Sequence, residues 1–236
     1  MPVSQLPPPK FWGILEYKPQ WSLTPLGWVI LLSIITLIMI VIATSIQPFL
    51  RVSRPIQADV MVLEGWVNDA VIKGAVAEFK AKNYQLMITT GTPISRGQQF
   101  SSYKTLAELA AATAIAWGLD PQSVVAVPTP VVKIDRTAAS AIAVKQWLSQ
   151  SELGVKAINL YSYDVHTRRS WFIFQQVLEP EIKVGAIAHP SRDYDVKQWW
   201  KSSAGAKSVI LETIGYCYAR LIWRNQLEID LKTEKT

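Results

Sequence analysis

The sequence predicts an α/β fold with a doubly wound, mainly parallel five-stranded sheet, preceded by one transmembrane helix. Three observations lead to this prediction. Between residues 58 and 223, five short apolar runs alternate with helical patterns. Strands that are apolar on both faces and separated by helices form parallel sheets covered on both sides. Before this domain, residues 26–46 carry no charge and are long enough to cross a bilayer.

The N-terminal part is predicted to form a leader, a single span and a tether. Residues 1–25 contain six prolines and are expected to be irregular. Residues 26–46 form the span, and Trp21 and Trp28 lie at its start, where amphipathic rings favour the headgroup level. A cleaved signal peptide is less favoured, because 25 residues precede the apolar run. Residues 47–57 contain two prolines and are expected to be a short tether.

The domain is predicted over residues 58–223, where apolar runs mark strands and amphipathic or Ala-rich segments mark helices. The expected strands cover residues 60–63, 85–90, 123–127, 156–161 and 182–188. The expected helices cover residues 68–82, 103–117, 135–150, 164–178, 194–202 and 206–223. Right-handed crossovers make this a Rossmann-like arrangement. Residues 224–236 form a charged tail that is expected to fray.

Composition limits the functions that the domain can have. One cysteine, Cys217, excludes a disulfide framework, and two histidines, His166 and His189, exclude a three-histidine zinc centre. The net charge of +6 is scattered, which favours anionic ligands weakly and argues against nucleic acid. The sequence contains no Gly-x-Gly-x-x-Gly, Walker or Gly-x-Ser-x-Gly motif, so the standard dinucleotide, NTP and hydrolase assignments lose most of their weight.

Candidate functional residues follow the ends of the predicted strands, because ligands of open α/β sheets bind beyond the carboxyl ends of the strands. The two candidate catalytic residues are Glu64 and His166. His166 lies in the first turn of a helix that Ser162 or Asp164 is expected to cap, and this position favours a neutral ring that can accept a proton. Glu64 is a candidate general base, ligand anchor or ion-pair partner of an arginine. A solvated surface histidine is the alternative for His166.

The candidate ligand-binding residues are polar, aromatic or small residues on the same strand-end loops or on the helices that follow. They are Trp66, Gly91, Thr92, Glu108, Arg136, Thr137 and Arg169. An arginine at a helix start opposes the helix dipole, so Arg136 and Arg169 predict an anion nearby, either a ligand or a carboxylate. Asp135 is expected to be the N-cap of its helix. Trp66 as a core residue and Glu108 as a solvated partner of Lys104 are the structural alternatives.

Glu64, Arg136, His166 and Arg169 are expected to meet on one concave surface. The reason is topological, because the first and fourth strands of a doubly wound sheet are neighbours across the point where the winding reverses.

Several motifs occur in a characteristic order: Asp59-Val-Met-Val-Leu, Thr90-Gly91, Gly118-Leu-Asp-Pro, Asp135-Arg-Thr and His166-Thr-Arg-Arg-Ser. Over residues 59–223 the chain therefore resembles the YdcF/SanA/ElyC family of bacterial envelope proteins. Many members have Gly-Gly where this chain has Glu64-Gly65-Trp66, and an Asn-Thr-x-x-Asn motif reads Arg136-Thr-Ala-Ala-Ser here, which indicates a divergent member. The resemblance implies a strand-end crevice and a role in envelope or cell-wall biogenesis, without a settled reaction.

Positive charges near the two ends of the span are nearly balanced and do not set its orientation. The resemblance implies a plasma (inner) membrane protein with a cytoplasmic amino terminus and an extracytoplasmic domain.

Two functions stay open at this point. In the first, the protein is an enzyme that acts on an anionic envelope intermediate bearing phosphate or carboxylate, such as a lipid-linked or glycan precursor. Arg136 and Arg169 would hold the anion, and His166 or Glu64 would move a proton. In the second, the same crevice is a non-catalytic module that senses the ligand or docks an envelope synthesis protein. No cofactor is identified, and a metal bound by Glu64, His166 and a further carboxylate is the less favoured alternative.

Overall fold

The computed structural model describes residues 10–223 except residues 19, 96 and 133. The first nine residues of the predicted leader and the predicted charged tail lie outside the described residues. The chain divides into two compact units, Met1–Ser45 and Ile46–Thr236.

The first unit holds three short strands and most of a long apolar helix. Strands β1 (Lys10–Phe11), β2 (Leu15–Lys18) and β3 (Gln20–Leu23) form an antiparallel sheet, so this stretch is not irregular as its prolines predicted. Helix α1 (Pro25–Leu50) is long and apolar enough to cross a membrane. Length and composition alone do not distinguish an anchor from a signal sequence.

The second unit contains a five-stranded sheet in which every pair of neighbouring strands is parallel, in the order β6-β5-β4-β7-β8. Its strands are β4 (Val60–Glu64), β5 (Leu86–Gly91), β6 (Val124–Pro128), β7 (Ala157–Tyr163) and β8 (Lys183–His189). The first and fourth strands of the domain, β4 and β7, are neighbours, with Val60 opposite Ile158. The structure therefore confirms the predicted fold class and the point at which the winding reverses.

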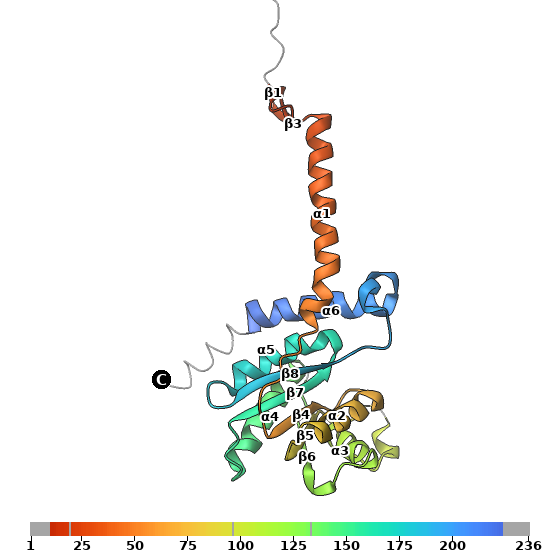
Figure 1. The fold of residues 1–236 in the computed structure, drawn as a ribbon, viewed down its shortest axis with the longest axis vertical. Coiled ribbons are helices and arrows are strands. Elements are labelled where there is room, and N and C mark those ends of the chain that lie inside the picture. The colour runs from red at the N-terminus through yellow and green to blue at the C-terminus, as the bar shows by residue number, and fades with distance from the viewer. Residues whose placement is uncertain (1–9, 19, 96, 133, 224–236) are drawn as a thin grey trace, which may run out of the picture. The chain divides into compact units, whose positions relative to one another are not determined.

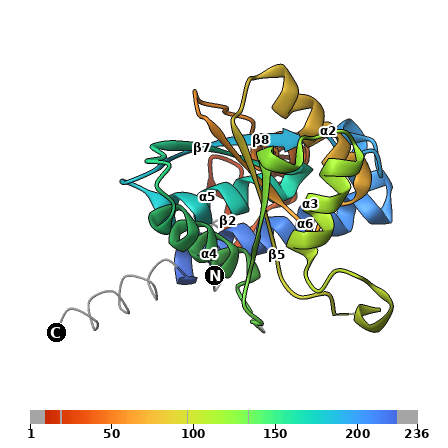
Figure 2. The ribbon, with the colours of Figure 1, turned by 90° about the horizontal axis from the view of Figure 1, so that it is seen from below.

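Helices cover both faces of this sheet, as Figures 1 and 2 show. Helices α2 (Asp69–Ala81) and α3 (Leu106–Ala116) lie on one face, and α4 (Arg136–Gln150) and α5 (Thr167–Leu178) lie on the other. Helix α6 (Ser203–Tyr218) continues as a π-helical turn, Ala219–Trp223, and contacts α5. Short 3₁₀ turns are Gln98–Phe100, Pro121–Ser123, Asp164–His166 and Val196–Lys201.

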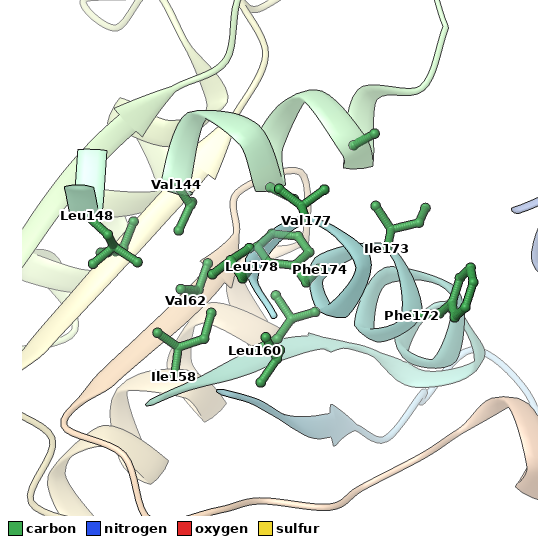
Figure 3. Close-up of a cluster of buried hydrophobic side chains, with 14 of the residues drawn as sticks. Val62, Val144, Leu148, Ile158, Leu160, Phe172, Ile173, Phe174, Val177 and Leu178 are labelled. Carbon is green, nitrogen blue, oxygen red and sulfur yellow. The ribbon is translucent and has the colours of Figure 1, made fainter. Parts of the chain in front are cut away.

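Two apolar layers hold the helices against the sheet. On the side of α4 and α5, Val62 and Leu160 of the sheet pack with Phe174 and Leu178 of α5 (Figure 3). On the side of α2 and α3, Met61, Leu63 and Met87 face a second cluster. Burial of each such side chain contributes roughly 1.5–3 kcal/mol to the free energy of folding. The two apolar layers therefore hold the sheet, and with it the strand ends, in place between the helices.

Residues 47–57 are part of the second unit rather than a free tether. Leu50 and Val52 are 0% and 5% exposed. The backbone N–H of Arg54 donates to Ala186 O at 2.7 Å, and Ala186 N–H donates back to Arg54 O at 3.1 Å. The side chain of Asn159 binds the backbone of Ile56, accepting from its N–H at 2.9 Å and donating to its carbonyl at 2.7 Å. The compact unit therefore begins at the last turn of α1, before the predicted domain boundary at residue 58.

Candidate functional site

A cleft of about 530 Å³ lies at the carboxyl ends of β4 and β5, beside the starts of α4 and α5. It is lined by Glu64, Trp66, Gly91, Thr92, Leu106, Ile134, Asp135, Arg136, Thr137, Ser140, His166, Arg169 and Glu212. The structure thus brings together every predicted site residue except Glu108, including the four that were expected to converge.

Glu64 is the last residue of β4 and is 2% exposed. Its carboxylate accepts hydrogen bonds from the hydroxyls of Ser162, on β7, and Ser170, on α5, the latter at 3.0 Å. Burial alone raises the pKa of Glu64, but the nearby His166 ring and the two hydroxyls lower it below its usual value. Glu64 is therefore a buried carboxylate in which each oxygen accepts a hydrogen bond from a serine hydroxyl. Ser162 binds Glu64 and does not cap a helix.

His166 lies between two carboxylates at the start of α5. Its Nδ1 is 2.9 Å from Glu212 Oε1, and its Nε2 is 3.4 Å from Glu64 Oε1. Burial lowers the pKa of His166, but Glu64 and Glu212 together raise it to about 9. This pKa favours the charged ring at neutral pH, opposite to the predicted neutral ring, because two carboxylates flank the imidazole.

The Nε2 atom of His166 is buried and has no hydrogen-bond partner among the described residues. It faces the Glu64 carboxylate as an ion pair, and the indole of Trp66 meets the imidazole edge-on, with ring centroids 4.7 Å apart. Trp66 is 45% exposed, so it forms a wall of the cleft and not part of the core.

Arg169 is held by Glu212, a residue of α6. Arg169 Nε donates to Glu212 Oε2 at 2.8 Å, and Nη2 donates to Oε1 at 3.2 Å. Burial raises the pKa of Glu212, but its hydrogen bonds with His166 and Arg169 lower it to about 2. Glu64 and His166, which are buried, and Glu212 and Arg169, which are half-buried, thus form a cluster whose two negative and two positive charges cancel.

Glu212 is not among the residues predicted from the sequence, which lie at strand ends or on the helices that directly follow them. A signal did exist, because Glu212 is the only acidic residue in the predicted helix 206–223. A single carboxylate in an otherwise apolar helix is a candidate for a buried residue that is paired with a positive charge. Its partners His166 and Arg169 are 46 and 43 residues earlier in the chain, so spacing does not reveal them.

The opposite wall of the cleft is the start of α4. Asp135 occupies the N-cap position, but its backbone is left-handed, with φ of 54°, and its side chain makes no capping hydrogen bond. The expected cap is therefore wrong: the first N–H groups of α4 receive no side-chain acceptor from Asp135. Arg136 is exposed at this end, and no carboxylate among the described residues pairs with it. Thr137 and Ser140 complete this wall.

Two glycines allow the cleft floor to approach α3 closely. A Cβ on Gly65 would lie 2.6 Å from the carbonyl oxygen of Leu106, and a Cβ on Gly91 would lie 2.8 Å from Leu106 Cβ. Glu108, by contrast, does not line the cleft. Its Oε2 accepts from the backbone N–H of Lys104 and Thr105 at 2.7 and 3.0 Å, which closes the capping box at the start of α3.

His189 lies at the end of β8 outside the cleft, where its Nδ1 is 2.8 Å from the Tyr161 hydroxyl. Within the described residues, no group of three or more His, Cys, Asp or Glu side chains is arranged to hold a metal ion.

No protein-family model matches the chain, and no curated protein matches it significantly. The fold and the site define a parallel α/β protein of Rossmann-like architecture with one apolar helix near its amino terminus. Its cleft joins a charge-balanced cluster to an open helix start that carries a free arginine side chain, within the part of the chain that the structure describes.

Proposed function

We propose that the protein is a membrane-anchored envelope or cell-wall biogenesis factor whose cleft binds an anionic envelope intermediate bearing phosphate or carboxylate. The observation that carries the ligand class is the wall formed by α4. Backbone N–H groups at a helix start and an arginine side chain are together suited to an anion. The motif resemblance supports the envelope role, the plasma membrane anchor and the extracytoplasmic domain.

Arg136 is the residue proposed to bind the anion. Arg169 is less suited to bind it, because it is already paired with Glu212. Arg169 directs Nε and Nη2 to Glu212, so its charge is already compensated. Arg136 is exposed beside the open start of α4 and has no such partner among the described residues. A ligand whose anionic group sits at α4 would place its remaining atoms between Trp66 and His166, since these residues line the same cleft.

In the catalytic form of this proposal, His166 acts as a proton donor. The imidazolium has a pKa of about 9, so it carries a proton to give at neutral pH and is a poor general base. Glu64 keeps the ring charged before transfer. After transfer the ring would be neutral, and the Glu64 carboxylate would stay ionised, held by the hydroxyls of Ser162 and Ser170. The donor would be Nε2, the ring nitrogen without a hydrogen-bond partner in the described residues.

The alternative is a non-catalytic module that senses the ligand or docks an envelope synthesis protein. One observation favours it: the charges of His166 and Arg169 are neutralised within the protein by Glu64 and Glu212. A site whose positive charges are already paired with carboxylates binds an anion less strongly than a site with two unpaired arginines.

Binding to the full chain in detergent distinguishes the residues involved. Inorganic phosphate, a phosphomonoester and a dicarboxylate are the probes, measured by calorimetry. We expect Arg136→Ala to weaken binding by more than about tenfold, since a charged hydrogen bond contributes about 1.5–3 kcal/mol. Arg192→Ala is the matched control, because Arg192 is exposed and does not line the cleft. Equal binding by both variants would remove the anion assignment.

Two further measurements test the remaining parts. His166→Gln should abolish turnover of a phosphomonoester and retain its binding if the protein is an enzyme, whereas a sensing module shows binding without turnover in wild type. A reporter fused after Thr236 should be active only outside the cytoplasm. Cytoplasmic activity of that fusion contradicts the envelope role.

A further inference from the structure

Helix α6 presents an apolar stripe to the outside of the second unit. Ile210, Leu211, Ile214, Tyr218 and Ile222 are between 39% and 61% exposed. They recur at intervals of three or four residues through α6 and the turn that follows it, and therefore share one face, named here the outward face. Exposed apolar surface of this extent marks a contact with a membrane or another molecule.

The inward face of the same helix is packed into the domain. Val209 is 1% exposed, and Ala219 and Trp223 are 2% and 8% exposed. This face also carries Glu212, the residue that holds His166 and Arg169 in the cleft. Helix α6 therefore has one face that builds the site and one that is left without a protein cover in the described residues.

The end of the apolar helix α1 indicates what covers the outward face. Residues 46–50 belong to the second unit, and Leu50, 0% exposed, packs with Val209 of α6. The rings of Phe49 and Tyr216 meet edge-on with centroids 5.6 Å apart. Residues 46–50 directly follow the part of α1 proposed to span the bilayer, and they contact α6 within the second unit. This continuity along the chain indicates a bilayer surface as the cover.

The polar residues around the outward face fit a lipid surface as well. Lys201 and Lys207 are exposed, and Trp200 is 44% exposed. The only acidic residue of α6 is Glu212, which points inward. Aromatic rings and lysines beside an apolar stripe are typical of helices that lie in the headgroup region.

We propose that α6 is a membrane-interface helix, with its outward face in the boundary between headgroups and acyl chains and its inward face supplying Glu212 to the cleft. This inference rests on the anchor in the proposed function, and it adds a second membrane contact made by the domain itself. The cleft is thereby tied to the bilayer surface through the helix that carries Glu212.

The test uses the full chain in liposomes of phosphatidylcholine and phosphatidylglycerol. The native Cys217 is exposed on α6 and accepts an environment-sensitive fluorophore. Quenching is measured with lipids that carry a nitroxide either near the headgroup or near the chain end. Two reference positions are prepared in a Cys217→Ser background: Leu37→Cys in the span and Gln122→Cys, exposed in the 3₁₀ turn before β6.

We expect headgroup nitroxides to quench the label at Cys217 several-fold more than the label at Gln122, and chain-end nitroxides to quench Leu37 most. The double substitution Leu211→Glu and Ile214→Glu should remove the quenching at Cys217. Both residues are more than half exposed, so the fold should be retained, which near-ultraviolet circular dichroism checks. Leu153→Glu is the matched control, because Leu153 is 57% exposed outside α6, and it should leave the quenching unchanged.

Failure of this inference and failure of the anchor give different results. If Leu37 is quenched and Cys217 is quenched no more than Gln122, the inference is wrong and the anchor stands. If neither Leu37 nor Cys217 is quenched, both proposals are wrong. Cross-linking of two copies through Cys217 without quenching would assign the outward face to a second copy of the chain and would overturn the lipid contact.

Discussion

The charge of His166 offers the sharpest test of the site, and Glu212→Gln is the perturbation. In the structure the ring has Glu212 Oε1 at 2.9 Å and Glu64 Oε1 at 3.4 Å. These carboxylates hold the pKa of His166 at about 9, against an ordinary value of 6.5. That difference corresponds to roughly 3 kcal/mol in favour of the charged ring. Replacing one of the two carboxylates by an amide should lower the pKa by at least about one unit, or about 1.4 kcal/mol.

The chain suits this measurement because it has only two histidines. Nuclear magnetic resonance of histidine-labelled protein in detergent should show two titrations on opposite sides of the ordinary value. His166 should stay protonated through neutral pH, whereas burial, together with Arg192 and Arg51, lowers the pKa of His189. His166→Gln assigns the signals. A wild-type His166 that titrates at or below its ordinary value would refute the charged cluster.

The same ring makes the stability of the domain depend on pH. The folded pKa of His166 is raised above its unfolded value, so the stabilisation is present below about pH 6.5 and is lost as the pH rises through about 9. We expect the free energy of unfolding to fall by roughly 2–3 kcal/mol across this interval. His166→Gln should flatten this part of the profile, and an unchanged slope in that variant would assign it to other groups.

The remaining predictions concern the scaffold and are measured by denaturant unfolding. A fragment starting at Arg54 should be less stable than one starting at Ile46 by more than about 2 kcal/mol, because it lacks the buried Leu50; equal stability would show that residues 46–53 are dispensable. Gly185→Ala should cost about 1–3 kcal/mol, since a Cβ there overlaps the Asn159 side chain. Thr105→Ala should cost about 1 kcal/mol through its lost N-cap and leave ligand binding unchanged.

The sheet and the pairing of its first and fourth strands could be predicted because the determining pattern is local. A run such as residues 60–63 is apolar at every position, which only a strand buried on both faces requires. Once the alternation with helices is known, right-handed crossovers place β4 beside β7, and Glu64 beside His166. The convergence of four predicted residues on one cleft follows from this topology alone.

The electrostatics of the site could not be predicted in the same way. Whether His166 is neutral or charged depends on Glu212, which approaches from α6, a helix outside the repeating strand–helix pattern. The right-handed crossover rule predicts where the strand ends lie. It does not predict the position of an additional helix that packs on α5. The left-handed backbone at Asp135 could likewise not be predicted, since aspartate at a helix start ordinarily caps.

The pairing of Arg54 with Ala186 has a consequence for any fragment of the domain that lacks residues 46–57. Strand β8 ends the sheet, so its outer edge offers unpaired backbone groups unless something covers them. The chain covers part of that edge with its own residues, through the two hydrogen bonds between Arg54 and Ala186. Cleavage after residue 57 would strip this cover and leave β8 open to pairing with the β8 of another molecule. A fragment without residues 46–57 would therefore expose this edge to pairing, whereas the longer chain covers part of it.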